Sequence, residues 1–152
     1  MKGASLAMLL ILAVNCGARQ QPPKKAPECK NAFSGLESFA KDVEKDFDRA
    51  CAVWDKILGS HAGTTQYVVN DVSIRVYPMS RPFQCGEVRQ AVGCTAQHWD
   101  GEDFGYTIFL DINRPRRSLR DTVYHEVGHV VLWEYGVLNH DTHHTIIEDA
   151  GL

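Results

Sequence analysis

The feature that most constrains the fold is a pair of neighbouring segments, residues 105–112 and residues 119–135. The first is rich in β-branched and aromatic residues, which favour a strand. In the second, apolar residues recur every three or four positions, which predicts an amphipathic helix. Ser118 is its expected N-cap, with Asp121 three residues later, and Gly136 is expected to end it. A strand followed by such a helix indicates a sheet on which helices pack.

The first half of the chain is expected to supply another long helix and two strands. From residue 31 to residue 58, apolar residues recur at helical spacing between charged ones, and Gly59 is expected to end this helix. Residues 67–69 and 72–77 carry β-branched and alternating side chains, which favour strands on either side of a turn. The apolar stripe of the helix is therefore predicted to be core.

The remaining segments are less regular. Residues 78–97 contain proline, glycine and two cysteines without a clear period, which predicts a loop closed by a disulfide. Residues 137–152 form a short C-terminal segment. The predicted fold class is α+β, with an N-terminal helix, a small mixed or antiparallel sheet, the helix at 119–135 and this C-terminal segment.

Length and charge exclude several kinds of protein. The chain has 152 residues, of which 44% are hydrophobic and 23% charged, so it fits one globular domain with its own core. Its formal net charge is −3, and no segment is basic enough to bind nucleic acid. We expect a monomer.

The N-terminal residues indicate export. Lys2 precedes an apolar run over residues 4–14, which is too short to span a bilayer but suits the core of a signal peptide. Residues 1–18 are the predicted signal peptide. Cleavage either follows Ala18 or precedes Cys16, where a lipobox-like sequence would place a lipid anchor for membrane attachment.

A tether and a single domain follow the signal peptide. Residues 19–28 are rich in proline and polar side chains, which predicts an extended, flexible tether. A tether directly after Cys16 favours the lipoprotein alternative. Residues 29–152 are the folded domain, which we expect in the periplasm or cell envelope.

Export also changes the interpretation of the cysteines. Cys29, Cys51, Cys85 and Cys94 form an even set, and in an oxidising compartment they predict two disulfides. One straight helix between the first two would separate them by about 33 Å, so that pairing requires the chain before the helix to fold back. The last two could close a short loop. The sequence leaves the pairing open.

The helix at 119–135 contains the motif His125-Glu126-Val127-Gly128-His129. Residues four apart share a helical face, so both histidines can direct a ring nitrogen at one metal ion. Zinc accepts such nitrogens at about 2.0–2.1 Å, and a catalytic site keeps one position open for water. We predict one Zn2+ per chain, bound by the two histidines, with Glu126 as the base that takes a proton from the water.

This motif, with the strand before its helix, resembles the zincin metallopeptidases. The resemblance covers residues 72–144, and only the motif itself is strongly specific. It implies a small zincin-like domain that hydrolyses a peptide or protein substrate. It also implies that residues 105–110, with Tyr106, Thr107 and Ile108, form an edge strand that binds the substrate backbone.

The third zinc ligand distinguishes the groups of zincins. A metzincin would carry glycine and histidine where this chain has Leu132 and Tyr135, so that group is excluded. A gluzincin would carry a glutamate at about the position of Glu148, but the asparagine usual before it is Ile147 here.

The remaining pattern is a cluster of three histidines in residues 140–144. A histidine at this distance beyond the motif resembles the SprT-like zincins, as does Trp133, although Thr145 stands where that group commonly has glycine. The candidates for the third ligand, in descending order, are His144, His143, Glu148 and His140.

Two other functions stay open at this level. The domain could bind zinc or a protein partner in the envelope, as a lipoprotein without turnover, or it could be a structural protein stapled by disulfides. Glu126 favours the enzyme, because zinc binding alone does not need that base. The substrate and its cleavage preference are not encoded in any recognisable pattern.

Overall fold

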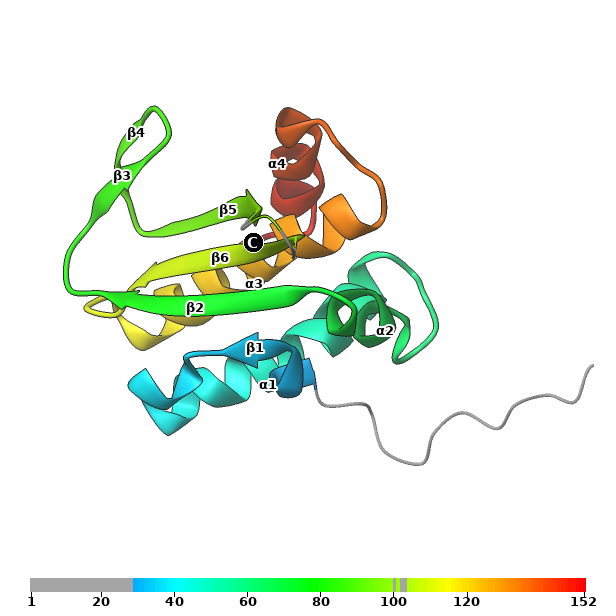
Figure 1. Cartoon of the computed structure of the whole chain (residues 1–152), viewed down its shortest axis with the longest axis horizontal. Helices are drawn as coiled ribbons and strands as arrows, with labels where there is room; N and C mark the ends of the chain where they lie inside the picture. The colour runs from blue at the N-terminus through cyan, green and yellow to red at the C-terminus, as the bar shows by residue number, and fades with distance from the viewer. Residues whose placement is uncertain (1–28, 100, 102–103) are drawn as a thin grey trace, which may run out of the picture.

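The computed structural model describes residues 29–99, 101 and 104–152, and Figure 1 shows the arrangement of their elements. The predicted signal peptide, Cys16 and the tether lie outside the described residues. Within the described part of the chain, no helix has the length and apolar composition needed to cross a membrane.

A four-stranded mixed sheet forms the centre of the fold. Its strand order is β1 (Phe33–Ser34), β2 (Ser73–Met79), β6 (Phe104–Asp111) and β5 (Gly93–Trp99). β1, β2 and β6 are parallel to one another, whereas β5 is antiparallel to β6. A separate hairpin, β3 (Phe83–Cys85) and β4 (Val88–Ala91), precedes β5 and projects away from the sheet (Figure 1). The prediction of an α+β fold with a small mixed sheet is confirmed.

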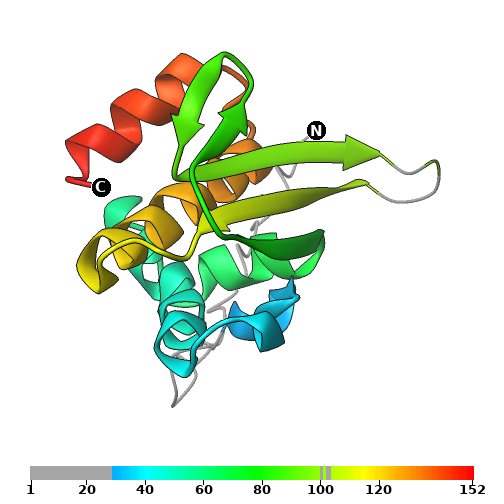
Figure 2. The same cartoon turned by 90° about the vertical axis from the view of Figure 1, so that its left-hand side faces the viewer.

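The helices pack mainly against one face of this sheet, since alternate residues of β2 on the other face are exposed. They are η1 (Cys29–Ala32), η2 (Leu36–Ser38), α1 (Lys41–Ile57), α2 (Thr64–Asn70), α3 (Arg116–Glu134) and α4 (His140–Asp149). α3 lies between α1 on one side and α4 on the other (Figures 1 and 2). The alternating buried residues of β2 and β6 contribute to the core: Ile74, Val76, Tyr106, Ile108 and Leu110.

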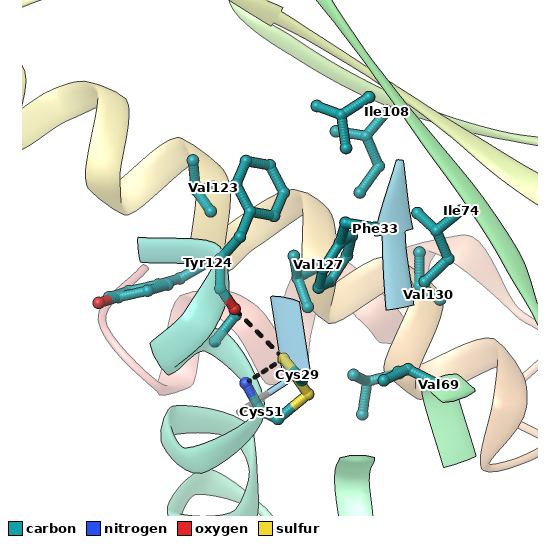
Figure 3. Packing of buried hydrophobic residues seen from close by; sticks show 14 of the residues in the cluster. Cys29, Phe33, Cys51, Val69, Ile74, Ile108, Val123, Tyr124, Val127 and Val130 are labelled. Atoms are coloured by element: carbon teal, nitrogen blue, oxygen red, sulfur yellow. Dashed lines mark hydrogen bonds between the residues drawn. A yellow bond between two sulfur atoms is a disulfide. The ribbon is translucent and has the colours of Figure 1, made fainter. Parts of the chain in front are cut away.

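The core brings distant parts of the sequence together around a disulfide. Cys29 and Cys51 are bonded to each other and fully buried. Figure 3 shows them with Phe33 of β1, Val69 of α2 and Val127 of α3. Burial of these side chains is the main source of stability, at about 1.5–3 kcal/mol for each large apolar side chain removed from water.

The α1–α3 contact depends on a glycine within the predicted metal-binding motif. The indole nitrogen of Trp54 donates a hydrogen bond to the carbonyl oxygen of Tyr124 over 2.8 Å, deep in the core. Its ring lies against Gly128, where an added Cβ would come closer than 3.0 Å to the indole. Gly128 therefore allows α1 to pack closely on the motif helix.

The structure settles the disulfide pairing that the sequence leaves open. Cys29 pairs with Cys51, and Cys85 pairs with Cys94. The prediction of two disulfides is confirmed. The second bond links the β3–β4 hairpin to β5.

The predicted helix over residues 31–58 is wrong in its first ten residues, because α1 begins at Lys41. Gly35 has a left-handed φ of 85°, which interrupts any helix there, and it packs against the main chain of Val76. The residues before α1 form η1, β1 and η2 and fold back beside this helix. This fold-back is what lets Cys29 reach its partner.

The predicted strand over residues 67–69 is also wrong, since these residues belong to α2. The cause is Asp55, near the end of α1. Its carboxylate accepts hydrogen bonds from the backbone N–H groups of Gly63, at 2.6 Å, and Thr65, at 2.8 Å. A carboxylate in this position satisfies the free donors of a helix N-terminus, which here outweighs the β propensity of the valines.

Two further segments differ from prediction, and the C-terminal segment forms a regular helix. Residues 78–97 are not a loop, since they contain the hairpin and much of β5, which pairs with β6. α3 begins at Arg116, so Ser118 lies inside its first turn instead of capping it. The C-terminal segment forms α4, which begins after Asn139, whose side chain accepts from the N–H of Thr142.

Candidate metal centre

Three histidine side chains meet between α3 and α4. One ligand nitrogen from each of His125, His129 and His144 lies within 4.8 Å of the others. A zinc ion that binds nitrogens at about 2.0–2.1 Å in tetrahedral geometry keeps them roughly 3.3 Å apart. Three imidazole nitrogens so close together form a group that could hold a metal ion.

The turn between α3 and α4 brings His144 to the motif. Gly136 adopts a φ of 81° and ends α3. Its N–H bonds to the carbonyl of Trp133, and the N–H of Val137 bonds to that of Leu132, both at 2.9 Å. This pair of bonds is a Schellman motif, which closes the helix and reverses the chain. α4 then runs back beside α3 with His144 toward the motif pair.

Burial keeps the motif histidines in the form that binds metal. Burial is the largest cause of a pKa of about 4 for His125, and the nearby His144 and His140 contribute the rest of the shift. The pKa of His129 is lowered well below its usual value, again mainly by burial and then by its histidine neighbours. Both rings are therefore neutral at pH 7, and a neutral imidazole is the form that coordinates zinc.

The structure separates the four candidates for the third ligand. His144 joins the motif pair, whereas Glu148 is exposed on α4. His143 is fully buried and contacts His129 through a ring nitrogen at 3.2 Å. His140 is exposed and stacks on His129 with ring centroids 4.9 Å apart. All three histidines of α4 thus contact the site, each in a different way.

Glu126 is a buried carboxyl group beside this cluster. Only 5% of its surface is exposed, and its pKa is raised to about 7, mainly by burial and after the lowering effect of a hydrogen bond from Thr95. The Thr95 hydroxyl lies 2.7 Å from Oε2 of Glu126 and 3.0 Å from its main-chain oxygen. β5 thus positions the carboxyl group from across the interface with α3.

Close packing between β5 and α3 depends on Gly93. An added Cβ at this position would come closer than 3.0 Å to the carboxylate of Glu126 and to the methyl group of Thr122. A side chain at residue 93 would therefore displace the carboxylate.

The candidate metal centre opens onto a cleft of about 740 Å³. β5 and the β3–β4 hairpin form one wall, and α3 and α4 form the others. Apolar side chains of Val88, Ala91 and Val92 line it together with Glu126 and the histidines. The Cys85–Cys94 disulfide also lines the cleft and ties the hairpin to the strand beside Glu126.

The predicted position of the substrate-binding edge strand is wrong. Residues 105–110 lie in β6, which pairs with β2 on one side and β5 on the other, so its main chain is already hydrogen-bonded. Tyr106 and Ile108 are buried in the core, and the Tyr106 hydroxyl donates to the carboxylate of Glu134. Thr107 lies 3.3 Å from a ring nitrogen of His98. The strand at the sheet edge near the cleft is β5.

Sequence patterns give little sign of Gly93 and Thr95, the residues of β5 that contact Glu126. Their segment mixes glycine, cysteine, alanine and glutamine without alternation, so it lacks the usual signal of a strand. Their importance comes from the pairing of β5 with β6, which no local pattern encodes.

Comparisons with known proteins identify no relative. The chain matches no protein-family model, no curated protein and no solved structure. Its function therefore has to be inferred from the side chains of the site and their geometry.

Proposed function

We propose that this protein is a zinc-dependent metallopeptidase that hydrolyses peptide bonds outside the cytoplasm. One observation carries the proposal. His125, His129 and His144 group together beside the buried carboxyl group of Glu126, and all four line the same cleft.

The three histidines favour zinc and leave it accessible. Neutral imidazoles suit zinc among the common metal ions, and three protein ligands leave the fourth tetrahedral position open, as catalytic sites require. When bound, the ion would supply a water of lowered pKa and positive charge for the developing oxyanion. The chain supplies two ligands from α3 and one from α4.

Glu126 is the proposed general base. Burial raises the pKa of this carboxyl group above its ordinary value, which makes it a stronger base toward the proton of the attacking water. Thr95 holds Oε2, so Oε1 remains available to accept the proton of the attacking water. Glu126 then passes this proton to the leaving amine, which completes hydrolysis without a second acid.

The substrate is proposed to bind as an extended strand along β5. Among the described strands, β5 pairs with β6 alone, so its other edge offers free N–H and C=O groups to a peptide. A peptide added there passes beside Glu126, because Gly93 and Thr95 of this strand both touch it. The apolar wall formed by Val88 and Val92 favours apolar substrate side chains.

Export is part of the proposal. Two disulfides in one small domain are typical of an oxidising compartment. This supports the predicted signal peptide and a location in the periplasm or envelope, with Cys16 as the proposed lipid anchor. The working unit is proposed to be a monomer.

Glu126 distinguishes this function from zinc binding without turnover. A buried carboxyl group with one hydroxyl partner costs free energy when ionised, and metal binding does not require it. A protein that only binds zinc or a partner gains nothing from this group. The enzyme is therefore the better explanation of the site.

Elemental analysis of the purified chain is the first test. We expect about one zinc per chain, lost in His125→Ala, because that variant removes a ligand. Glu126→Gln should retain zinc but lose peptidase activity on a peptide library by about 100-fold or more. Absence of zinc from the parent protein, even after zinc is supplied, would reject the proposal. Equal activity in the parent and Glu126→Gln would reject the role of Glu126.

A further inference from the structure

His143 is a buried polar side chain with both ring nitrogens engaged. None of its surface is exposed. Its Nε2 lies 2.6 Å from the carbonyl oxygen of Val137, in the turn that precedes α4. Its Nδ1 lies 3.2 Å from Nδ1 of His129. The ring therefore links the α3–α4 turn to a proposed zinc ligand.

The hydrogen-bond partners of His143 determine where the protons lie. A carbonyl oxygen can only accept, so Nε2 of His143 must donate to Val137. In the neutral ring, Nδ1 of His143 is then the acceptor. Nδ1 of His129 must therefore carry the proton and donate it across the 3.2 Å contact. This arrangement leaves the lone pair of His129 on Nε2.

We propose that His143 is a positioning residue for the metal centre: it fixes the tautomer and ring orientation of His129 so that Nε2 is presented to the ion. The inference rests on the proposed zinc site. Two adjacent residues of α4 then have different roles. His144 is proposed to bind the ion directly, and His143 supports a ligand on α3. Partners of this kind typically change metal affinity by about 10–100-fold when removed.

A structural role is the competing explanation. The His143 ring also packs against Trp133, with centroids 5.1 Å apart, and its bond to Val137 anchors the turn. A purely structural histidine would matter through that bond and through packing, and its contact with His129 would be incidental. The two explanations therefore assign importance to different nitrogens of one ring.

Two substitutions separate these nitrogens. In His143→Asn, the side-chain oxygen can occupy the position of Nδ1, so it can still accept from His129, but the reach to Val137 is lost. In His143→Gln, the longer amide can donate to Val137 from the position of Nε2, but it places no acceptor at Nδ1. His143→Phe keeps the ring shape and removes both bonds.

The experiment measures zinc affinity, by competition with a chromogenic chelator, and thermal unfolding of the metal-free proteins. We expect His143→Gln and His143→Phe to bind zinc about 10–100-fold more weakly than the parent. His143→Asn should recover most of the affinity even if its metal-free form is the less stable of the two amide variants. Absorption of the cobalt-substituted proteins should change in His143→Gln and His143→Phe and stay near that of the parent in His143→Asn.

The positioning role of His143 and the metal centre itself would be rejected by different results. Zinc affinity in His143→Gln equal to or above that in His143→Asn would reject positioning and leave the structural role. The two amide variants suffice for this decision if His143→Phe does not fold. A parent protein that binds neither zinc nor cobalt would instead reject the metal centre, and the role of His143 with it.

Discussion

The two helices that supply the histidines are stabilised very differently. Ten of the nineteen residues of α3 are buried, whereas α4 buries only His143 and Ile147 of its ten residues. α3 is part of the core, and its motif takes shape as the domain folds. α4 is a peripheral helix whose two buried side chains lie on the side that faces the domain. Substitutions of the buried residues of α3 should therefore affect the stability of the domain, whereas most substitutions in α4 should affect it little.

The same contrast extends to two larger regions. We define the core region as η1, α1, α3, β2 and β6, and the cleft rim as β3, β4, β5 and α4. Each region has a disulfide, Cys29–Cys51 in the core region and Cys85–Cys94 in the cleft rim. Each also has a crowded glycine, Gly128 and Gly93. Apart from the site residues His125, Glu126 and His129 of α3, we expect changes in the core region to lower stability and changes in the cleft rim to lower metal affinity or activity.

The largest effect is expected from His144→Ala in the cleft rim. Structural zinc sites release about 10–16 kcal/mol over their ligands, so one ligand contributes roughly 4 kcal/mol. We therefore expect zinc affinity to fall by about 1000-fold, measured by chelator competition. The metal-free protein should unfold at nearly the same temperature as the parent, because His144 is only half-buried.

His140→Ala is the matched control on the same helix. Its ring also contacts His129 and lines the cleft, but its nitrogens lie outside the group of three. Zinc affinity should change by less than about tenfold, since no ligand is lost. Should His140→Ala lose zinc as completely as His144→Ala, the third ligand has been assigned to the wrong residue.

The glycine pair gives the next largest effect. A methyl group at Gly93 displaces the carboxylate of Glu126, and a misplacement of about 1 Å can cost roughly 100-fold in rate. We therefore expect Gly93→Ala to lower kcat by about 100-fold, with zinc content and unfolding temperature close to those of the parent. Peptide cleavage, elemental analysis and thermal unfolding measure the three quantities.

Gly128→Ala is the core counterpart. The added methyl group collides with Trp54, and overpacking of this kind costs about 1–3 kcal/mol of stability. Its main effect should be on denaturant unfolding. If Gly93→Ala destabilises the domain as much as Gly128→Ala, the contrast between cleft rim and core region does not hold.

What could be predicted from the sequence follows the same division. The helix carrying His125 and His129 is predicted because its pattern is local: residues four apart on one helix meet whatever surrounds them. The strand at residues 72–77 and the one at 105–112 are found for similar reasons, since alternation is also local. These elements make up most of the core region.

Elements that depend on tertiary contacts could not be predicted in this way. α2 forms because the Asp55 carboxylate binds its first N–H groups, and no pattern within residues 67–69 contains that information. β5 is a strand because β6 pairs with it, so the contact between Thr95 and Glu126 is invisible before the fold is known. His144 ranks first among four candidates from sequence, but its separation from His143 depends on which side of α4 faces α3.

The smallest effect concerns the pH dependence of the metal-free protein. Burial raises the pKa of Glu126 from 4.5 to about 7. Below about pH 4.5 the group is protonated in both the folded and the unfolded chain, so its ionisation costs no stability. As pH rises toward 7, the unfolded chain ionises first, and the folded state becomes less stable by an amount that is constant above about pH 7.

Glu126→Gln removes this penalty because an amide does not ionise. At about pH 8 the metal-free variant should be more stable than the metal-free parent by up to about 3 kcal/mol, because a buried amide and a protonated carboxyl group need similar partners and differ only in the ionisation penalty. The gain should shrink steadily below pH 7 and vanish near pH 4, as measured by urea unfolding of both proteins in the presence of a chelator. A gain that is independent of pH would mean that residue 126 acts on stability through packing alone. Ionisation of the Glu126 carboxyl group would then not lower the stability of the folded protein.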